Sequence, residues 1–212
     1  MILFVLLRKT FKWLTTKDLF RIRCQIDNRG KLRLQKYVDG QKNKLVVGER
    51  SVLKDVRILI SGNSNTIIIG DDCYLGNNCS IRAEGNNINV SIGNKCTFTH
   101  DTELCAQEDG SEIRIGDDCM FSHHINIRTS DSHLIYDIKS GNRINFPKSV
   151  FVGNHVWVAP NVIIMKGVNI GDGSIIGSNA IVTKNVQSCQ LAAGIPAKVV
   201  KQDVSWSREK LF

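Results

Sequence analysis

The stretch IGDDCYLGNNCSI, from Ile69 to Ile81, decides the fold, because variants of it return along most of the chain. Each variant is built of units of about six residues, in which an aliphatic residue, often followed by glycine, precedes two polar residues and a small or branched one. Further copies begin at Val47, Ile92, Ile115, Val152 and Ile170. No helical period is seen in this region, and its many Gly and Asn residues disfavour helices.

The spacing between copies shows where the chain adds residues. From Ile69 onward, successive copies begin 23, 23, 37 and 18 residues apart. Three units of six residues form one triangular coil with three short strands, and equivalent residues stack about one strand spacing apart. The longer copies add residues only after the third unit begins. All additions should therefore project from one corner of a prism, and the largest lies in the stretch from Asn126 to Lys148.

The pattern predicts an all-β chain of 212 residues. We expect a β-helix domain over residues 47–200, with a protruding loop over 129–150 and a tail over 201–212. Residues 1–46 should form a helical segment and short strands. Residues 1–23 place apolar side chains on one stripe and basic ones off it. Such a helix could cover the open end of the prism, pack on a neighbouring subunit or lie on an anionic membrane surface.

Composition narrows the choice of partner and compartment. The formal net charge of +8 favours an anionic partner. Aromatic residues are few and no basic–aromatic motif is present, so we expect no nucleic-acid binding. Seven cysteines without a CxxC pair argue against a disulfide scaffold and favour a reducing, cytoplasmic location. Residues 1–23 could in addition attach the protein to the inner face of the membrane.

Three cysteines occupy the same place in consecutive coils. They are Cys73, Cys96 and Cys119, and Val156 and Ser174 continue the column. Cysteine can act as a small hydrophobic residue, so we interpret the column as inward packing and not as a redox or metal site. Cys24, Cys105 and Cys189 fall outside inward positions.

The histidines raise the question of a metal. His100 and His123 hold equivalent places in adjacent coils, with His124 beside them. Stacked imidazoles could bind a metal ion. No third histidine falls at a matching place, so we expect no metal and assign these residues to a groove beside His133. His155 occupies an outward position and is expected to be solvated.

His133 lies inside the longest addition, in the motif TSDSH, and Trp157 follows in the next coil, in HVWVAPNV. With the hexapeptides from Val47 to Val200, these motifs resemble the hexapeptide-repeat acyltransferases, most nearly the sugar and capsular polysaccharide O-acetyltransferases. The resemblance implies a left-handed β-helix, a homotrimer with the site between two prisms, and a saccharide acceptor. In such enzymes a loop histidine is the general base and a tryptophan in the next coil walls the site.

The same resemblance implies a coenzyme A site in the last coils. The segments IIGSNAIVTKNV and LAAGIPAKVVK match the family's C-terminal coenzyme segment. The residues carried over as acetyl-CoA contacts are Trp157, Ala159, Pro160, Gly177, Ser178, Thr183, Lys184, Lys198 and Lys201. Among them, Thr183 and Lys184 would hold the adenine end. Lys198 and Lys201 would face the phosphates.

The implied chemistry suits a histidine. A hydroxyl is a poor nucleophile at neutral pH, and an imidazole can take its proton as the oxygen attacks the thioester of acetyl-CoA. Asp131 or a backbone carbonyl could orient His133. Three other readings stay open: an acetyltransferase for a nucleotide-linked amino sugar, an antibiotic or serine; a metalloenzyme like the carbonic anhydrases; and a non-catalytic β-helix module.

Overall fold

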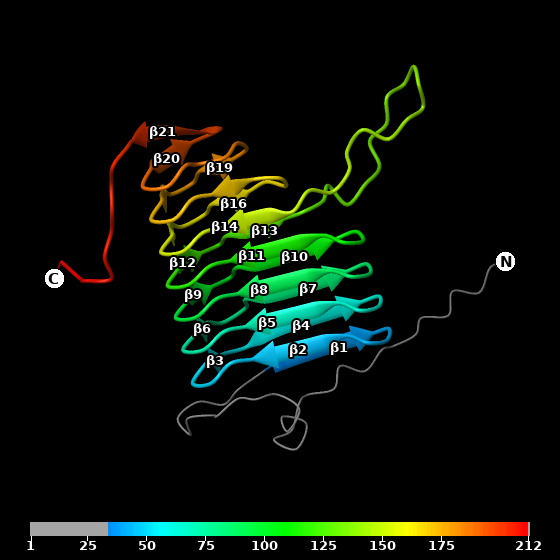
Figure 1. Ribbon diagram of the computed structural model, residues 1–212, viewed down its shortest axis with the longest axis horizontal. Helices are drawn as coiled ribbons and strands as arrows, with labels where there is room; N and C mark the ends of the chain where they lie inside the picture. The colour runs from blue at the N-terminus through cyan, green and yellow to red at the C-terminus, as the bar shows by residue number, and fades with distance from the viewer. Residues whose placement is uncertain (1–33, 212) are drawn as a thin grey trace.

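The computed structural model describes residues 34–211 as a triangular prism of stacked strands (Figure 1). The expected helical segment of residues 1–23 lies outside the described residues. Within residues 34–211 no helix long and apolar enough to cross a membrane is found.

Three sheets form the faces of the prism. Sheet A contains, in spatial order, β1 (Leu34–Asp39), β4 (Val56–Ser61), β7 (Ser80–Glu84), β10 (Glu103–Gln107), β13 (Asn126–Arg128), β16 (Ile163–Ile164) and β19 (Ile181–Val182). Sheet B contains β2 (Lys44–Val47), β5 (Thr66–Ile69), β8 (Asn89–Ile92), β11 (Glu112–Ile115), β14 (Val150–Val152) and β17 (Asn169–Ile170). Sheet C contains β3 (Val52–Leu53), β6 (Tyr74–Leu75), β9 (Thr97–His100), β12 (Met120–His123), β15 (Trp157–Val158), β18 (Ile175–Ile176), β20 (Leu191–Gly194) and β21 (Ala197–Lys201).

Each strand from β1 to β20 pairs in parallel with a strand one coil away, so the sequence repeat becomes the register of the sheets. Ile69, for example, pairs with Val47 on one side and Ile92 on the other. All three side chains are buried, and the column continues through Ile115. Phe98 and Phe121 stack in the same way, with ring centroids 4.5 Å apart. The core is therefore one continuous rod of aliphatic and aromatic columns, as the repeat predicts.

The cysteine column is confirmed as inward packing. Cys73, Cys96 and Cys119 are each 0–1% exposed, and Val156 and Ser174 below them are also buried. Each of the three thiols contacts a glycine carbonyl one coil away, at 3.0–3.1 Å. Cys105 is also buried, although it lies on the outer side of sheet A between Arg82 and Arg128. Cys189 is exposed, and Cys24 lies outside the described residues.

Tight corners explain the polar residues of the repeat. Asp72, Lys95, Asp118 and His155 succeed one another at one corner, and all have φ between 52° and 57°. This left-handed conformation is strained for most side chains and easiest for Gly, Asn and Asp. The next coil places Gly173 there, with φ 68°.

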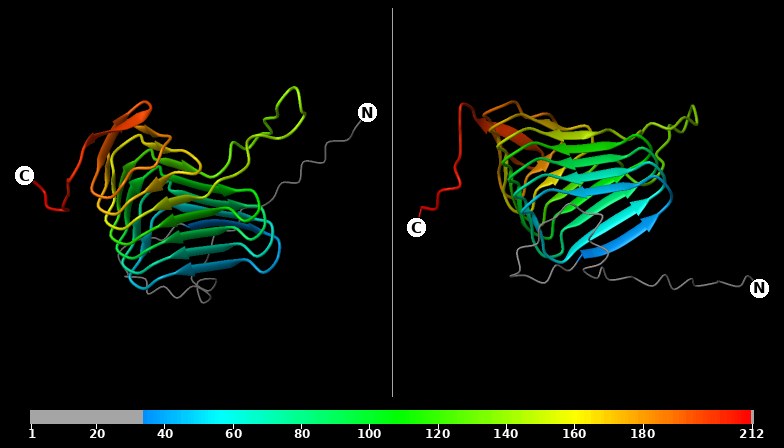
Figure 2. Two further views of the ribbon diagram at one scale, coloured as in Figure 1. Left: turned by 45° about the horizontal axis from the view of Figure 1, so that its top comes forward. Right: turned by 60° about the horizontal axis from the view of Figure 1, so that its bottom comes forward.

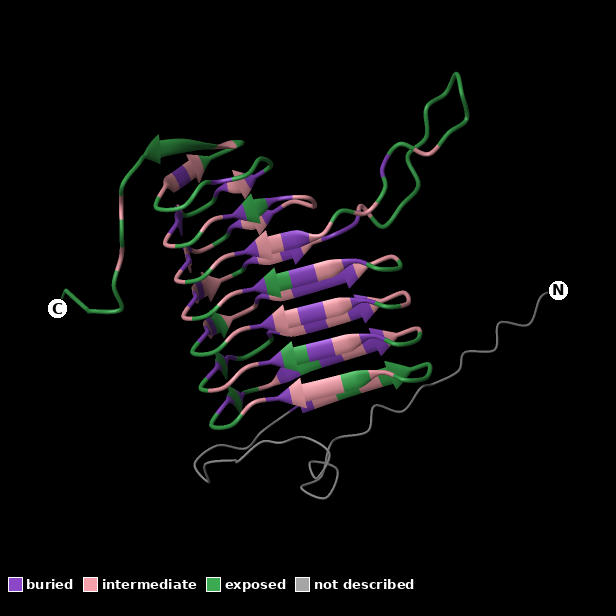
Figure 3. Ribbon diagram, in the orientation of Figure 1, coloured by how far each residue is buried: buried purple, intermediate pink, exposed green. Residues whose placement is uncertain are grey.

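The additions all leave from one corner, between sheets A and B. The turns from β7 to β8 and from β10 to β11 stack at this edge, and residues 129–149 project beyond them between β13 and β14 (Figures 1 and 2). The prediction from the spacing is thus confirmed. Figure 3 shows the contrast between the buried strands and the largely exposed projection.

The two ends of the prism differ from the expected boundaries. β1 already pairs with β4 in parallel, so the described part of the β-helix includes Leu34, ahead of the expected start at Val47. The first coil is hard to see in the sequence because its strand LQKYVD lacks the regular aliphatic spacing. At the other end, β21 turns back antiparallel to β20. The chain then runs down the side of the prism (Figure 1).

Candidate active site

Residues 129–149, here called the arm, fold as a two-stranded projection held by their own contacts. Tyr136 and Arg143 form an antiparallel bridge, and the Ile144 amide donates to the Ile135 carbonyl at 2.9 Å. At the tip, the Asp137 carboxylate accepts hydrogen bonds from the amide and hydroxyl of Ser140. The arm therefore has a defined shape beyond the prism.

Glu108, in the preceding coil, binds the base of the arm. The Ser130 hydroxyl, which is 1% exposed, donates to the Glu108 carboxylate, and Arg143 forms an ion pair with it at 2.6 Å. Partial burial opposes ionisation of Glu108, but the contacts with Ser130 and Arg143 prevail and lower its pKa. Thr129 is fully buried and exchanges two hydrogen bonds with the backbone of Gln107.

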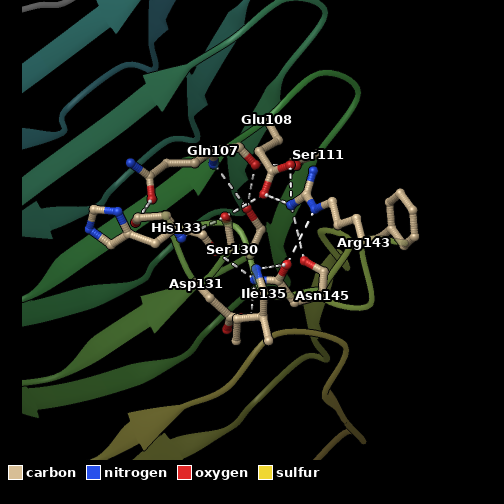
Figure 4. A network of polar contacts seen from close by, with 12 residues as sticks. Gln107, Glu108, Ser111, Ser130, Asp131, His133, Ile135, Arg143 and Asn145 are labelled. Carbon is tan, nitrogen blue, oxygen red and sulfur yellow. Dashed lines mark hydrogen bonds and ion pairs between the residues drawn. The ribbon is translucent and has the colours of Figure 1, made fainter. Parts of the chain in front are cut away.

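Asn145 ties the two sides of the arm together (Figure 4). Its side chain is buried, and its amide group donates to the carbonyl of His133 at 2.7 Å and to Asp131 at 3.0 Å. Its carbonyl oxygen accepts from the Ile135 amide at 2.8 Å. One side chain thus fixes the backbone on both sides of Leu134, and with it the root of the His133 side chain.

Asp131 is bound to its neighbours in the arm and the next coil. Its carboxylate lies 2.6 Å from the ammonium group of Lys166, which follows β16 in the next coil. Hydrogen bonds from Lys166 and Asn145 lower the pKa of Asp131. Among residues 34–211 no hydrogen bond joins this carboxylate to the His133 imidazole. Asp131 thus supports the arm, and an orienting role toward the His133 ring stays a prediction.

His133 itself is exposed at the side of the arm. Figure 4 shows its backbone inside the hydrogen-bonded network and its ring outside it. An imidazole presented on a rigid support, with access for a substrate, can take a proton from a hydroxyl. The structure thus fixes the main chain of His133 and leaves its ring exposed.

Trp157 lies on another face of the same chain. It belongs to β15 in sheet C, whereas the arm follows β13 in sheet A. The indole of Trp157 is half-buried and approaches that of Trp206, with ring centroids 6.2 Å apart. One chain alone does not bring His133 and Trp157 together.

The residues proposed for the cofactor fall into three groups. Trp157, Ala159, Pro160, Gly177 and Ser178 lie on or just after β15 and β18, where successive coils turn from sheet C to sheet A. The amide of Asn179 donates to the Pro160 carbonyl at 2.9 Å, which joins the two coils there.

The remaining cofactor candidates also lie toward the C-terminal end of the prism. Thr183 and Lys184 are exposed directly after β19, at the same corner as the arm. Lys198 and Lys201 are exposed on β21, the last strand. Lys198 lies near the first group, because it pairs with Ala193, and Ala193 lies against Gly177. Thr183 and Lys184 lie away from that group.

Within one chain, His100, His123 and His124 do not lie beside His133. They lie where sheet C turns into sheet A, before β10 and β13, whereas His133 lies after β13. A groove shared with His133 therefore does not form within one chain. The expectation that His155 is solvated is wrong.

His155 is instead held by the C-terminal tail. Its ring bonds Asp118 at 2.7 Å and stacks on Trp206 with centroids 4.2 Å apart. The Trp206 indole donates to the His155 carbonyl at 2.8 Å. Arg208 continues the contact by pairing with Asp118 at 2.9 Å. The tail is therefore docked on sheet C, next to Trp157.

Family models match two parts of the chain. The bacterial transferase hexapeptide model (six repeats) covers residues 149–184, and the model for the hexapeptide repeat of succinyl-transferase covers residues 66–98. Both matches fall on coils of the prism.

Similarity over most of the chain is found to polysialic acid O-acetyltransferases. The enzyme of Neisseria meningitidis is 34% identical over 180 residues, which cover 81% of this chain and 79% of that one. The solved structure of the polySia specific acetyltransferase NeuO has 33% identity and a TM-score of 0.66, over 84% of this chain and 91% of the other. That of the polysialic acid O-acetyltransferase OatWY has 32% identity and a TM-score of 0.59, over 82% and 92%. The chain belongs to the hexapeptide-repeat acyltransferase family, with the β-helix fold that its repeats predict.

Other matches are partial. The polysialic acid O-acetyltransferase of Escherichia coli O1:K1 is 44% identical over 82 residues, which are 39% of this chain and 27% of that relative. The galactoside O-acetyltransferase of Escherichia coli K12 is 42% identical over 64 residues, 30% of each chain. The chain thus spans less than a third of these two relatives.

Proposed function

We propose that this protein transfers an acetyl group from acetyl-CoA to a hydroxyl of a bacterial capsular or surface polysaccharide, with His133 as the general base. The observation that carries the proposal is the clamped arm, which presents an exposed imidazole from a rigid base. The names of the relatives that match most of the chain support a sialic acid polymer as the first acceptor to test.

In the proposed mechanism, the acceptor hydroxyl loses its proton to His133 as its oxygen attacks the thioester carbonyl. The tetrahedral intermediate then expels the thiolate of coenzyme A, which takes up a proton. Direct transfer needs no acyl-enzyme, and the buried thiols of the prism are not available as nucleophiles. General-base assistance of this kind is typically worth about 10²–10⁴-fold in rate.

The proposed active unit is a homotrimer. His133 and Trp157 leave one prism on different faces, so a site containing both requires the arm of one chain to approach sheet C of another. The composition of the arm supports this arrangement, because it exposes large apolar side chains that a neighbouring copy could cover. They are Leu134, Ile135, Tyr136, Ile138, Ile144 and Phe146.

The proposed cofactor site uses the corner of Trp157, Ala159 and Ser178 for the pantetheine arm, with the exposed lysines of the last coils near the phosphates. Ammonium groups there would balance the charge of a polyanionic coenzyme. We also propose a cytoplasmic location, with residues 1–23 able to attach the enzyme to the inner face of a membrane. Equal solubility of the full chain and a chain lacking residues 1–23 in fractionated cells would refute the attachment.

The decisive experiment is a transfer assay with a panel of acceptors. Purified protein is incubated with acetyl-CoA and polysialic acid, other capsular polysaccharides, galactosides or chloramphenicol, and products are read by mass spectrometry. A mass increase of one acetyl group on a saccharide supports the proposal. Acetylation of chloramphenicol alone would replace it with the second candidate, an antibiotic acetyltransferase, which several partial matches favour.

A further inference from the structure

A cluster of three side chains stands apart from the arm, at the corner where sheet C turns into sheet A. We propose that His100, Asp101 and His124 bind a divalent transition-metal ion, with Zn²⁺ as the natural candidate. The cluster lies at the corner that also carries Trp157, in the two preceding coils, and contains no residue assigned to acetyl transfer.

The distances within the cluster suit a shared ion. His100 Nδ1 lies 2.6 Å from Asp101 Oδ2, and His124 Nε2 lies 3.8 Å from the same oxygen. One ligand atom from each residue falls within 4.8 Å of the others. Ligand atoms of tetrahedral zinc, each about 2.0–2.2 Å from the ion, lie roughly 3.3–3.6 Å from one another. The His100–Asp101 pair therefore has to open by somewhat less than an ångström, and the more widely spaced atoms have to close by about an ångström. The side chains are 34–59% exposed, which leaves them room to move and leaves a coordination position open to water.

The donor set selects the kind of ion. Two imidazoles and one carboxylate suit zinc, cobalt or nickel, whereas calcium and magnesium prefer oxygen ligands. The sequence led us to expect no metal, because a third histidine was missing from the matching positions. The structure supplies the third ligand as Asp101, which the fold brings beneath His124.

The repeat explains how the ligands meet. His100 and His123 pair across β9 and β12, and their rings stack with centroids 4.8 Å apart. His124 stands edge-on to both rings, at 5.6 Å and 5.1 Å. The His123 ring thus supports one face of the His100 ring. His123 is also close enough to serve as a further ligand or to line the site.

The test is zinc binding by the full chain, without an affinity tag, measured by calorimetry. Cys24 and Cys189 are replaced with serine so that thiols outside the buried columns do not compete. One zinc per chain is expected. His100→Ala and His124→Ala should each weaken binding by more than about 100-fold, since even outer-shell changes cost about 10- to 100-fold. Asp101→Asn, which keeps a side chain suited to the corner, should also weaken it.

His155→Ala is the matched control, a histidine at another corner of the prism, and should bind zinc like the parent. Melting temperatures of all variants show that the prism is intact. Cobalt(II) gives a second readout, because its visible spectrum in the parent should show nitrogen and oxygen ligation without a thiolate band. Zinc binding that is absent, or unchanged in His100→Ala, His124→Ala and Asp101→Asn, would overturn the proposal.

Discussion

At the scale of single residues, Asn145 connects the fold to the proposed chemistry. It holds the carbonyl of His133, the carboxylate of Asp131 and the amide of Ile135 with one buried side chain. A small displacement of a catalytic group can be costly, with about 100-fold in rate for a misplacement of about 1 Å. Asn145 is therefore a positioning residue for His133.

We predict that Asn145→Ala lowers kcat by about 10- to 100-fold and changes the KM for acetyl-CoA little. Asn145→Asp should be as harmful, because it loses both donated hydrogen bonds and sets a second carboxylate beside Asp131. Amide hydrogen exchange in residues 131–146 should rise in both variants. An Asn145→Ala enzyme with normal kcat and normal exchange would show that the clamp does not position His133.

The two carboxylates at the base of the arm predict its response to acid. Both Asp131 and Glu108 have lowered pKa values in the folded chain. Their contribution is therefore present above the ordinary carboxyl pKa of about 4 and is lost as the pH falls through the lower folded values. We expect pepsin to cleave the arm much faster at about pH 2 than at about pH 4, after normalisation to an unfolded peptide of the same sequence. Equal normalised rates would contradict this account.

At the scale of elements, the C-terminal tail is a clasp on sheet C. The Trp206 ring stacks on His155, and Arg208 reaches Asp118, the Thr97 hydroxyl and the Cys119 carbonyl. The tail thereby links several coils that otherwise contact only their neighbours. Such a link should contribute to the stability of the prism, because each coil of a quasi-one-dimensional stack is otherwise stabilised only by its neighbours.

We predict that Trp206→Ala destabilises the chain by about 1–2 kcal/mol, from the lost stacking and the lost indole hydrogen bond. That loss corresponds to a melting temperature several degrees lower for a chain of this size. Glu209→Ala is the control, since its side chain lies exposed beyond the clasp. Identical melting temperatures for the parent and Trp206→Ala would mean that the tail does not stabilise the prism.

The buried cysteines form another element-scale feature, with a simple chemical signature. Contact with Cys119 and burial raise the pKa of Cys96 to about 12, and burial raises that of Cys105 to about 11. In a Cys24→Ser variant we predict rapid labelling of Cys189 alone by a thiol reagent, with the other cysteines reacting after denaturation. Rapid native labelling of further thiols would show that the column is open to solvent.

The sequence predicted the repeat, the corner of the additions and the inward cysteines, because each depends on a period that recurs. It did not predict the contacts of Glu108, Arg143 and Asn145, since these arise only when the arm folds back on an earlier coil. The alternation of polar Arg143 and Asn145 with apolar Ile144 and Phe146 was the one local signal of a strand whose polar side chains share one side. The pairing of His155 with the tail spans 51 residues and leaves no periodic trace.

At the scale of the whole molecule, the separation of His133 and Trp157 leads to a test of assembly. A mixture of His133→Ala and Trp157→Ala chains, unfolded and refolded together, should regain part of the activity that each variant lacks. Mixed trimers would contain an interface with an intact His133 from one chain and an intact Trp157 from another. No recovery in mixed oligomers would place both residues in a site within one chain, or Trp157 outside it.

The central claim is that His133 is the base for acetyl transfer, and one measurement tests it most directly. With the acceptor found by the panel, steady-state rates are compared for the parent, His133→Ala, His133→Asn and the arm-tip control Lys139→Ala. We predict that kcat falls by about 10²–10⁴-fold in both His133 variants, with the KM for acetyl-CoA nearly unchanged and Lys139→Ala close to the parent. A His133→Ala enzyme with the parent's kcat would contradict the account.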